Sequence, residues 1–157
     1  MRVPAAPRAT AVATATATAT VVAVALLLGG CSQTPAERLE EWYGSGGEDQ
    51  IKKLNEDAGR VNEVSMRTID VQGLACQDLL AQTAEAEKLD PIPDEAAQRY
   101  WKEALGGFRR GAAECADGAA KKDESQVSRG IRGVQTEGLP KLVGTVSMIK
   151  AGLAAAK

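Results

Sequence analysis

Apolar residues recur at every third or fourth position between residues 95 and 116, and this spacing constrains the fold most strongly. The stripe comprises Ala97, Trp101, Ala104 with Leu105, Phe108, Ala112 and Cys115. Side chains at that spacing share one face of an α-helix, so the segment predicts a helix that is buried along its length. Gly106 and Gly107 weaken the middle of this helix and indicate either a kink or a close crossing by a second helix.

Three more segments carry helical stripes. Residues 48–67 contain Ile51, Leu54, Ala58, Val61 and Val64, and residues 70–88 contain Val71, Leu74 or Ala75, Leu79, Thr83 and Ala86. The last stripe comprises Val127, Ile131, Val134, Gly138, Leu142, Thr145 with Val146, Ile149 and Leu153. The composition is rich in alanine and only 3% aromatic, which favours helix. We therefore expect an all-α fold, an antiparallel four-helix-type bundle with a short N-terminal helix.

Cap and turn signals predict where these helices begin and end. Thr34–Glu37 matches a capping box, and Gly44–Gly47 stops the short first helix. Trp42, at the end of that helix, is expected to be a packing residue, and the alternative places Trp42 and Tyr43 at the lipid headgroups. The other signals are Pro91 and Pro93 as a break, Asp94 as an N-cap, Asp117-Gly118 as a helix end, Asp123 or Ser125 as the last helix start, and a kink before Pro140.

Residues 1–31 carry the signals of export. Arg2 and Arg8 are the only charged residues in this segment, and a continuous apolar run ends at Leu28. That run is shorter than the ~20 residues that a membrane-spanning helix needs, but it suits the apolar region of a signal peptide. An ordinary secretory signal and an uncleaved membrane anchor are the alternatives to the interpretation that follows.

The motif Leu28-Gly29-Gly30-Cys31 resembles the lipobox of bacterial lipoproteins. The resemblance implies that a peptidase recognises Leu28, Gly29 and Gly30 and cuts before Cys31. It also implies that the Cys31 thiol carries a diacylglyceryl group and that its new amino group is a possible site of acylation. Two or more acyl chains hold a small domain firmly on a bilayer. We therefore expect a lipid anchor in the cell membrane, with the protein on the extracytoplasmic face.

Cleavage at this point divides the chain into three parts. Residues 1–30 are the removed signal peptide, residues 31–47 the lipidated N-terminus with a short helix and Gly-rich turn, and residues 48–157 the helical bundle domain. The mature chain contains all 21 acidic residues but lacks two of the 19 basic ones, so its net charge is −4. Nucleic-acid binding domains carry a strongly basic face. We expect no nucleic-acid partner.

Cys76 and Cys115 are the remaining cysteines of an exported chain, and we predict a disulfide between them. Cys76 lies about 12 residues before the end of its predicted helix, whereas Cys115 lies about 20 residues into the next one. A simple hairpin would leave the two about 12 Å apart along the axis, at ~1.5 Å per residue. The bridge therefore requires the Pro-rich segment 89–94 to run along the helix axis. Two buried free thiols are the alternative.

The sequence contains no recognisable catalytic apparatus. It has no histidine, which is the commonest general base and the commonest metal ligand. It also lacks a nucleophile elbow, a P-loop, a dinucleotide fingerprint and a Cys-rich metal site. We therefore expect a protein that is not an enzyme and that has no catalytic residue, no metal ligand and no cofactor.

Three features together resemble the small alanine-rich helical lipoproteins of actinobacteria. They are the lipobox, one cysteine on each of two central helices, and Pro91-Ile92-Pro93-Asp94 followed by Trp101. The resemblance extends over most of the chain. It implies the location and the helical architecture, and it transfers no catalytic residue to this sequence.

A permanent anchor joined to a compact domain favours a binding or accessory module for another component of the cell envelope. The alternative is a carrier or sensor of a small ligand or lipid, with an apolar cavity in the bundle near Trp101, Phe108 and the kinked last helix. Trp101 and Phe108 are accordingly the candidate residues of a ligand or partner surface. The membrane and an envelope protein are the expected partners.

Overall fold

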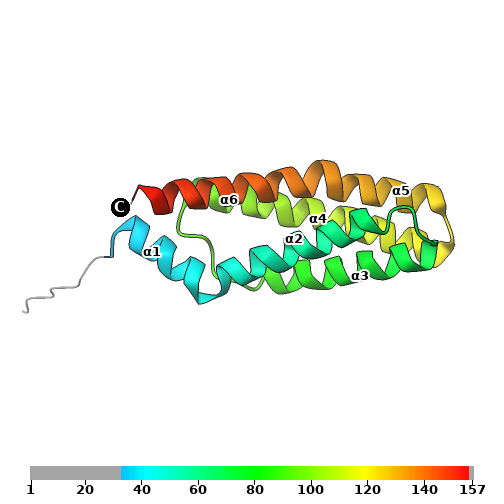
Figure 1. The fold of residues 1–157 in the computed structure, drawn as a ribbon, viewed down its shortest axis with the longest axis horizontal. Helices are drawn as coiled ribbons and strands as arrows, with labels where there is room; N and C mark the ends of the chain where they lie inside the picture. Colours follow the sequence, from blue (N-terminus) through cyan, green and yellow to red (C-terminus); the bar gives the residue numbers. More distant parts are fainter. Residues whose placement is uncertain (1–32, 156–157) are drawn as a thin grey trace, which may run out of the picture. The chain divides into compact units, whose positions relative to one another are not determined.

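Four rods of helix pack side by side in antiparallel directions in the computed structural model, which describes residues 33–155 (Figure 1). The first rod comprises α1 (Pro35–Trp42), the bend η1 (Tyr43–Gly47), in which Ser45 and Gly46 are not helical, and α2 (Glu48–Glu63). The second and third rods are α3 (Ile69–Ala86) and α4 (Glu95–Lys121), and the fourth comprises α5 (Glu124–Gly133), the π-helical turn η2 (Val134–Gly138) and α6 (Leu139–Ala154). No described residue lies in a strand, and the predicted all-α bundle is confirmed.

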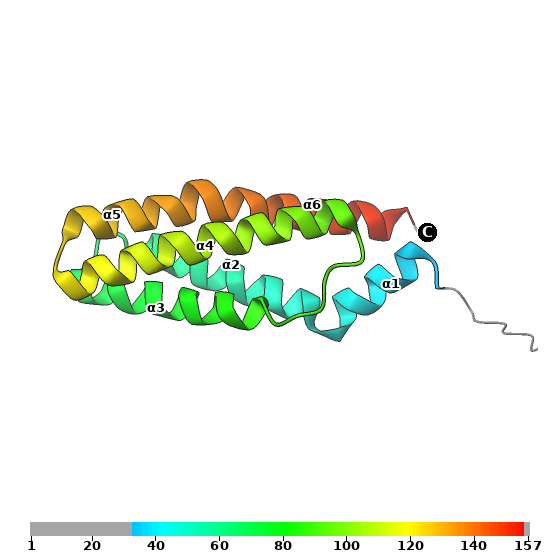
Figure 2. The same ribbon diagram turned by 180° about the vertical axis from the view of Figure 1, so that it is seen from behind.

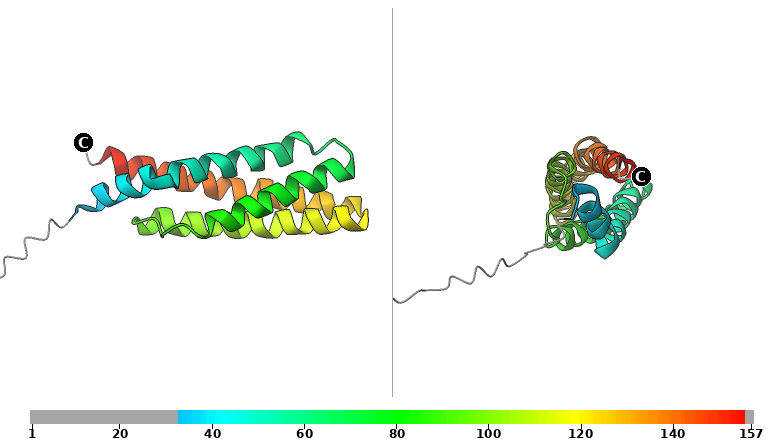
Figure 3. Two further views of the ribbon diagram at one scale, coloured as in Figure 1. Left: turned by 90° about the horizontal axis from the view of Figure 1, so that it is seen from below. Right: turned by 90° about the vertical axis from the view of Figure 1, so that its left-hand side faces the viewer.

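The described chain begins and finishes at the same end of this bundle (Figure 1). The opposite end, which we call the distal end, is formed by the α2–α3 loop (64–68) and the α4–α5 turn (122–123). Viewed along their length, the four rods surround one core (Figure 3). Its largest fully buried side chains include Phe108, Leu54, Leu79, Leu142 and Ile149. The stripes predicted for the second, fourth and last helices supply most of this core.

Helix α1 forms for the reason that its sequence indicates. The Thr34 hydroxyl accepts a hydrogen bond from the Glu37 amide at 3.2 Å, and the Glu37 carboxylate accepts one from the Thr34 amide at 2.7 Å. These two bonds complete the predicted capping box. The rod then bends at Gly46, whose φ of 123° is open to glycine but strained for other residues. Leu39 is buried in the same core, so α1 belongs to the bundle and residue 47 is not a domain boundary.

The rotation of α3 differs from the expected one. Val71 was expected to point inward, but 42% of its surface is exposed, and of the pair Leu74 and Ala75 only Ala75 is buried. A Cβ on Gly73 would lie 2.5 Å from the Cβ of Ala119, so α3 turns its smallest residue toward α4. That rotation also directs Cys76 inward and leaves Val71 facing solvent.

The segment between α3 and α4 runs along the bundle rather than across its end (Figure 2). Ile92 is 3% exposed, and its amide donates a hydrogen bond to the Gln98 side chain at 2.8 Å. The Trp42 indole donates a second bond to the carbonyl of Asp90 at 2.7 Å. These contacts hold the segment in the extended path that a bridge between α3 and α4 requires.

Helix α4 is longer than the sequence indicated. It continues past Asp117-Gly118 to Lys121, and Lys122 then adopts the left-handed conformation with φ of 57°. Gly118 is helical because α5 passes close to it: an added Cβ would lie 2.7 Å from the amide nitrogen of Val127. The predicted N-cap at Asp123 is confirmed by its bond to the Gln126 amide at 2.9 Å.

The irregularity expected before Pro140 is also present. Pro140 has no N–H group, so the carbonyl four residues earlier lacks its usual helical donor. The chain responds with the wider turn η2, in which the Leu139 amide donates to the carbonyl of Val134. Gly107 of α4 crosses this turn closely, since a Cβ there would lie 2.7 Å from the Gly138 nitrogen. Gly107 therefore marks a close crossing, whereas Gly106 beside it faces only the end of the Arg110 side chain.

Candidate functional site

A disulfide joins α3 to α4 near the distal end of the bundle. Cys76 and Cys115 are bonded, their Cα atoms lie 6.0 Å apart, and both side chains are completely buried. The predicted bridge is confirmed. Because it lies inside the core, it holds the beginning of α3 against α4 and limits how far the neighbouring α2–α3 loop can move.

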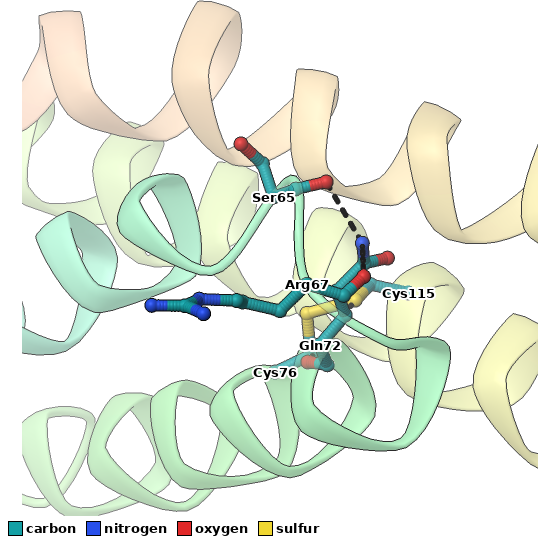
Figure 4. The surroundings of a disulfide bond; sticks show 5 residues. All are labelled: Ser65, Arg67, Gln72, Cys76 and Cys115. Atoms are coloured by element: carbon teal, nitrogen blue, oxygen red, sulfur yellow. Dashed lines mark hydrogen bonds between the residues drawn. A yellow bond between two sulfur atoms is a disulfide. The ribbon is translucent and has the colours of Figure 1, made fainter.

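The side chain of Gln72 ties the α2–α3 loop to the helix that carries Cys76 (Figure 4). Its Nε2 atom donates hydrogen bonds to the carbonyls of Ser65 and Arg67, each at 2.8 Å. The loop also closes on itself, since the Arg67 amide donates to the carbonyl of Val64 at 2.8 Å. With its carbonyls satisfied in this way, the loop is held in one conformation.

Large apolar side chains are nevertheless exposed on this ordered end. Met66, between the two carbonyls that Gln72 binds, is 93% exposed, and Leu74 and Val71 on α3 are 61% and 42% exposed. We call Met66, Val71 and Leu74 the distal patch. Val71 and Leu74 are three positions apart on α3 and so share one side of that helix, and Met66 belongs to the loop that leads into it. Contiguous exposed apolar residues mark interaction sites more often than scattered ones do. The patch is therefore the candidate functional site of the described residues.

A shallow cavity of 290 Å³ adjoins the patch between α3 and α4. Leu74 and Gln77 form part of its wall, and the close approach of Gly73 to Ala119 provides a small-residue floor. Asp70 and Lys122 also line the cavity, and they form an exposed ion pair at its edge. The arrangement offers an apolar recess with a charged rim, which can receive a side chain but holds no reactive pair of groups.

Trp101 and Phe108, the candidate surface residues from the sequence, are both buried. Trp101 is 3% exposed and packs edge-on against Trp42 with ring centroids 6.4 Å apart, and Phe108 is completely buried. A groove of 320 Å³ includes Trp101 in its lining but not Phe108. Both rings fill the core in this structure, and Trp42 packs in the core as expected.

Two basic residues near the distal end form ion pairs. Arg129 pairs with Glu114 at 3.0 Å, and Lys122 pairs with Asp70. Arg109 pairs with Glu87 at 2.6 Å beside the other end of α3. Each pair is exposed and so contributes little to stability. Within residues 33–155, Arg67, Lys121 and Arg132 form no ion pair, so the distal end keeps unpaired basic side chains.

Cys31 and the residues Leu28, Gly29 and Gly30 lie outside the described part of the chain. Within residues 33–155, no group of three or more His, Cys, Asp or Glu side chains is placed to bind a metal ion. No helix of that same part is long and apolar enough to cross a membrane.

The distal patch is the feature that sequence reasoning missed. Val71 and Leu74 occur at helical spacing within an apolar stripe, so they were assigned to the core. Met66 lies between the second and third stripes, and that break in the pattern was the available signal. No protein-family model, no curated protein and no solved structure matches this chain. Its function is therefore argued from its own residues.

Proposed function

We propose that this protein is a lipoprotein, anchored on the outer face of the cell membrane through Cys31, that binds another protein of the envelope through its distal patch. The observation that carries the binding role is the exposure of Met66 at 93% on a loop held by hydrogen bonds. The anchoring role rests on the sequence of residues 1–31 and on the resemblance to actinobacterial helical lipoproteins.

The ordered loop favours a binding role because it lowers the cost of association. A partner that binds a mobile loop must first order it, at roughly 0.5–1.5 kcal/mol for each flexible side chain that is fixed. Here the Gln72 amide already fixes the backbone on both sides of Met66. Full burial of an exposed Met or Leu side chain contributes about 1.5–3 kcal/mol. Met66 and Leu74 can therefore serve as the apolar centre of an interface.

The position of the patch suits a protein held at its other end. The 16 residues of α2 separate the η1 bend from the α2–α3 loop, a length of about 24 Å at 1.5 Å per residue. The described chain begins on the opposite side of that bend. An anchor close before residue 33 would therefore leave the distal patch pointing away from the bilayer, toward neighbouring envelope proteins.

The anchor is tested by metabolic labelling with an alkyne fatty acid in the native host. We expect the unmodified chain to be labelled and to remain with the membranes, because the lipid is attached at Cys31. The Cys31→Ser variant should incorporate no label and should migrate as the uncleaved precursor. Equal labelling of the two proteins would refute lipidation at this residue.

The binding role is tested by placing a photoreactive amino acid at Met66 in intact cells. We expect one reproducible cross-linked product, which the additional substitution Leu74→Ser reduces at least tenfold because it removes an apolar contact. The matched control carries the same reagent at Lys53, which is exposed on α2 away from the patch. Products of the same pattern and yield from both positions would show random collision and would contradict the proposal.

A further inference from the structure

A second apolar recess lies far from the distal patch, between α2 and α6. It has a volume of 520 Å³, within the range of about 300–1,000 Å³ that is usual for small-ligand sites. Ile51 and Leu142 form its floor and are 8% and 2% exposed, while Val146 is partly buried and Val143 is 61% exposed. Most of the apolar lining therefore lies below the surface of the bundle.

Polar groups of both helices line the same recess. Lys52 comes from α2 and Lys150 from α6, and Asn55 and Ser147 accompany them. Neither lysine forms an ion pair with any residue of the described range, whereas several other basic side chains of the bundle do. Glu48, the acidic residue of the lining, leaves the recess with one net positive charge. Two unpaired ammonium groups beside an apolar floor are complementary to an anionic headgroup on an apolar tail.

Tyr43 closes the recess at the η1 bend. Burial raises its pKa, and so does the neighbouring carboxylate of Glu48, through its charge and through a hydrogen bond from the tyrosine hydroxyl. The bend at Gly46 places Tyr43 beside the first turn of α2. This end of the recess belongs to the half of the bundle where the described chain begins, away from the distal patch.

We propose that the recess between α2 and α6 binds a long-chain fatty acid, with the tail over Ile51, Leu142 and Val146 and the carboxylate between Lys52 and Lys150. The unpaired lysines beside an apolar floor favour this ligand over a partner helix or a second copy of the chain. This binding site is separate from the distal patch in position and in chemistry, and either site can exist without the other.

The test uses the full chain, purified from membranes and reconstituted in nanodiscs of neutral phosphatidylcholine. The probe is palmitic acid that carries a diazirine near the end of its tail, and labelled peptides are located by mass spectrometry after illumination. We expect saturable labelling within residues 48–55 and 142–150. Unlabelled palmitate should compete at least tenfold better than hexadecanol, because charge-assisted bonds to a carboxylate are stronger than bonds to a neutral hydroxyl.

Two pairs of variants separate this site from general contact with lipid. Lys52→Ala with Lys150→Ala should reduce labelling at least tenfold, whereas Lys53→Ala, an exposed neighbour outside the recess, should leave it unchanged. Val143→Asp should reduce labelling, whereas Leu74→Asp, at the same 61% exposure in the distal patch, should not. Circular dichroism melting curves check that all variants fold.

Five results would overturn the proposal. The first three are labelling spread evenly over the chain, equal competition by hexadecanol and palmitate, and equal labelling of the lysine double variant and the Lys53→Ala control. A cross-link between two chains across α2 and α6 would instead identify the recess as an interface and would also overturn it. A monoalkyl phosphate that displaces the probe at least tenfold better than palmitate would identify a phosphate headgroup and would refute the assignment to a fatty acid.

Discussion

Gly130→Ala is the substitution for which the structure predicts the largest effect at a single methyl group. Gly130 lies where α5 crosses α4, and the structure leaves no room for a Cβ at that position. An added Cβ would lie 2.6 Å from the carbonyl oxygen of Gly111 and 2.7 Å from the Cα of Cys115, and it would also meet the Cys115 amide nitrogen. These are backbone atoms, which cannot rotate away as a flexible side chain can.

The size of the effect follows from these distances. Carbon atoms in contact lie about 3.5–4.0 Å apart, so α4 and α5 must separate by about 1 Å to accept the methyl group. Overpacking of this kind typically costs about 1–3 kcal/mol, and displacement of two backbones places it at the upper limit. Alanine recovers about 1 kcal/mol through its higher helix propensity. The net loss in the free energy of unfolding is about 2 kcal/mol, or roughly a 10 °C decrease in Tm for a domain of this size.

Gly59→Ala is the matched control. Gly59 lies inside α2, and a Cβ there meets no other atom within 4 Å. The same change should therefore stabilise the protein by about 0.5–1 kcal/mol. Both variants are measured by urea unfolding of residues 33–157 with the disulfide intact. If Gly130→Ala unfolded at the same urea concentration as Gly59→Ala, the close crossing of α4 and α5 would be wrong.

Three more predictions concern the disulfide, a left-handed residue and a partly buried carboxylate. Cys76 and Cys115 are 39 residues apart, so reduction of their disulfide should lower the free energy of unfolding by about 4 kcal/mol. Urea unfolding with reductant is compared with urea unfolding without it, and a difference below about 1 kcal/mol would contradict the chain-entropy argument. Lys122→Gly should raise stability by about 1 kcal/mol because glycine adopts a φ of 57° without strain, and an unchanged or lower Tm would count against that conformation. Burial raises the pKa of Asp57 above its ordinary 3.8, so its contribution to stability is fully present below that value and is lost as the pH rises through the folded-state pKa. The Tm of Asp57→Asn should therefore rise relative to that of the unmodified protein as the pH increases from 3 to 7. A Tm difference that stays constant with pH would refute the raised pKa of Asp57.

Much of the fold could be predicted because the stripes of α2, α4 and the last rod are regular. Trp101 and Phe108 occur seven residues apart, and no other helix face within residues 33–155 buries two aromatic rings at that spacing. The cysteine pair was predictable in the same way, since the Pro-rich segment 89–94 is long enough to correct the offset between the two helices. Local spacing and chain length decide these features, and both can be read directly from the sequence.

The remaining features depend on contacts between distant residues. Gly118 resembles a helix stop in the sequence. In the structure it lies inside α4, and a glycine is needed there because Val127 of α5 passes too close for a side chain. The outward face of α3 depends on the contact between Gly73 and Ala119, which are 46 positions apart. The distal patch follows from this rotation of α3, so it could not be separated from the core by periodicity. The recess between α2 and α6 likewise requires the pairing of two helices from opposite halves of the chain.

The return of the chain to its starting end has a practical consequence. Four antiparallel passes bring residue 155 back beside the first helix, so a reporter fused at the C-terminus would emerge at the end of the bundle where α1 begins. Such a fusion would leave the distal patch unobstructed. A reporter inserted between Lys122 and Asp123, at the α4–α5 turn, would instead stand next to the patch and block access to it. The two positions therefore provide a permissive and an obstructive site for the same tag in a single protein.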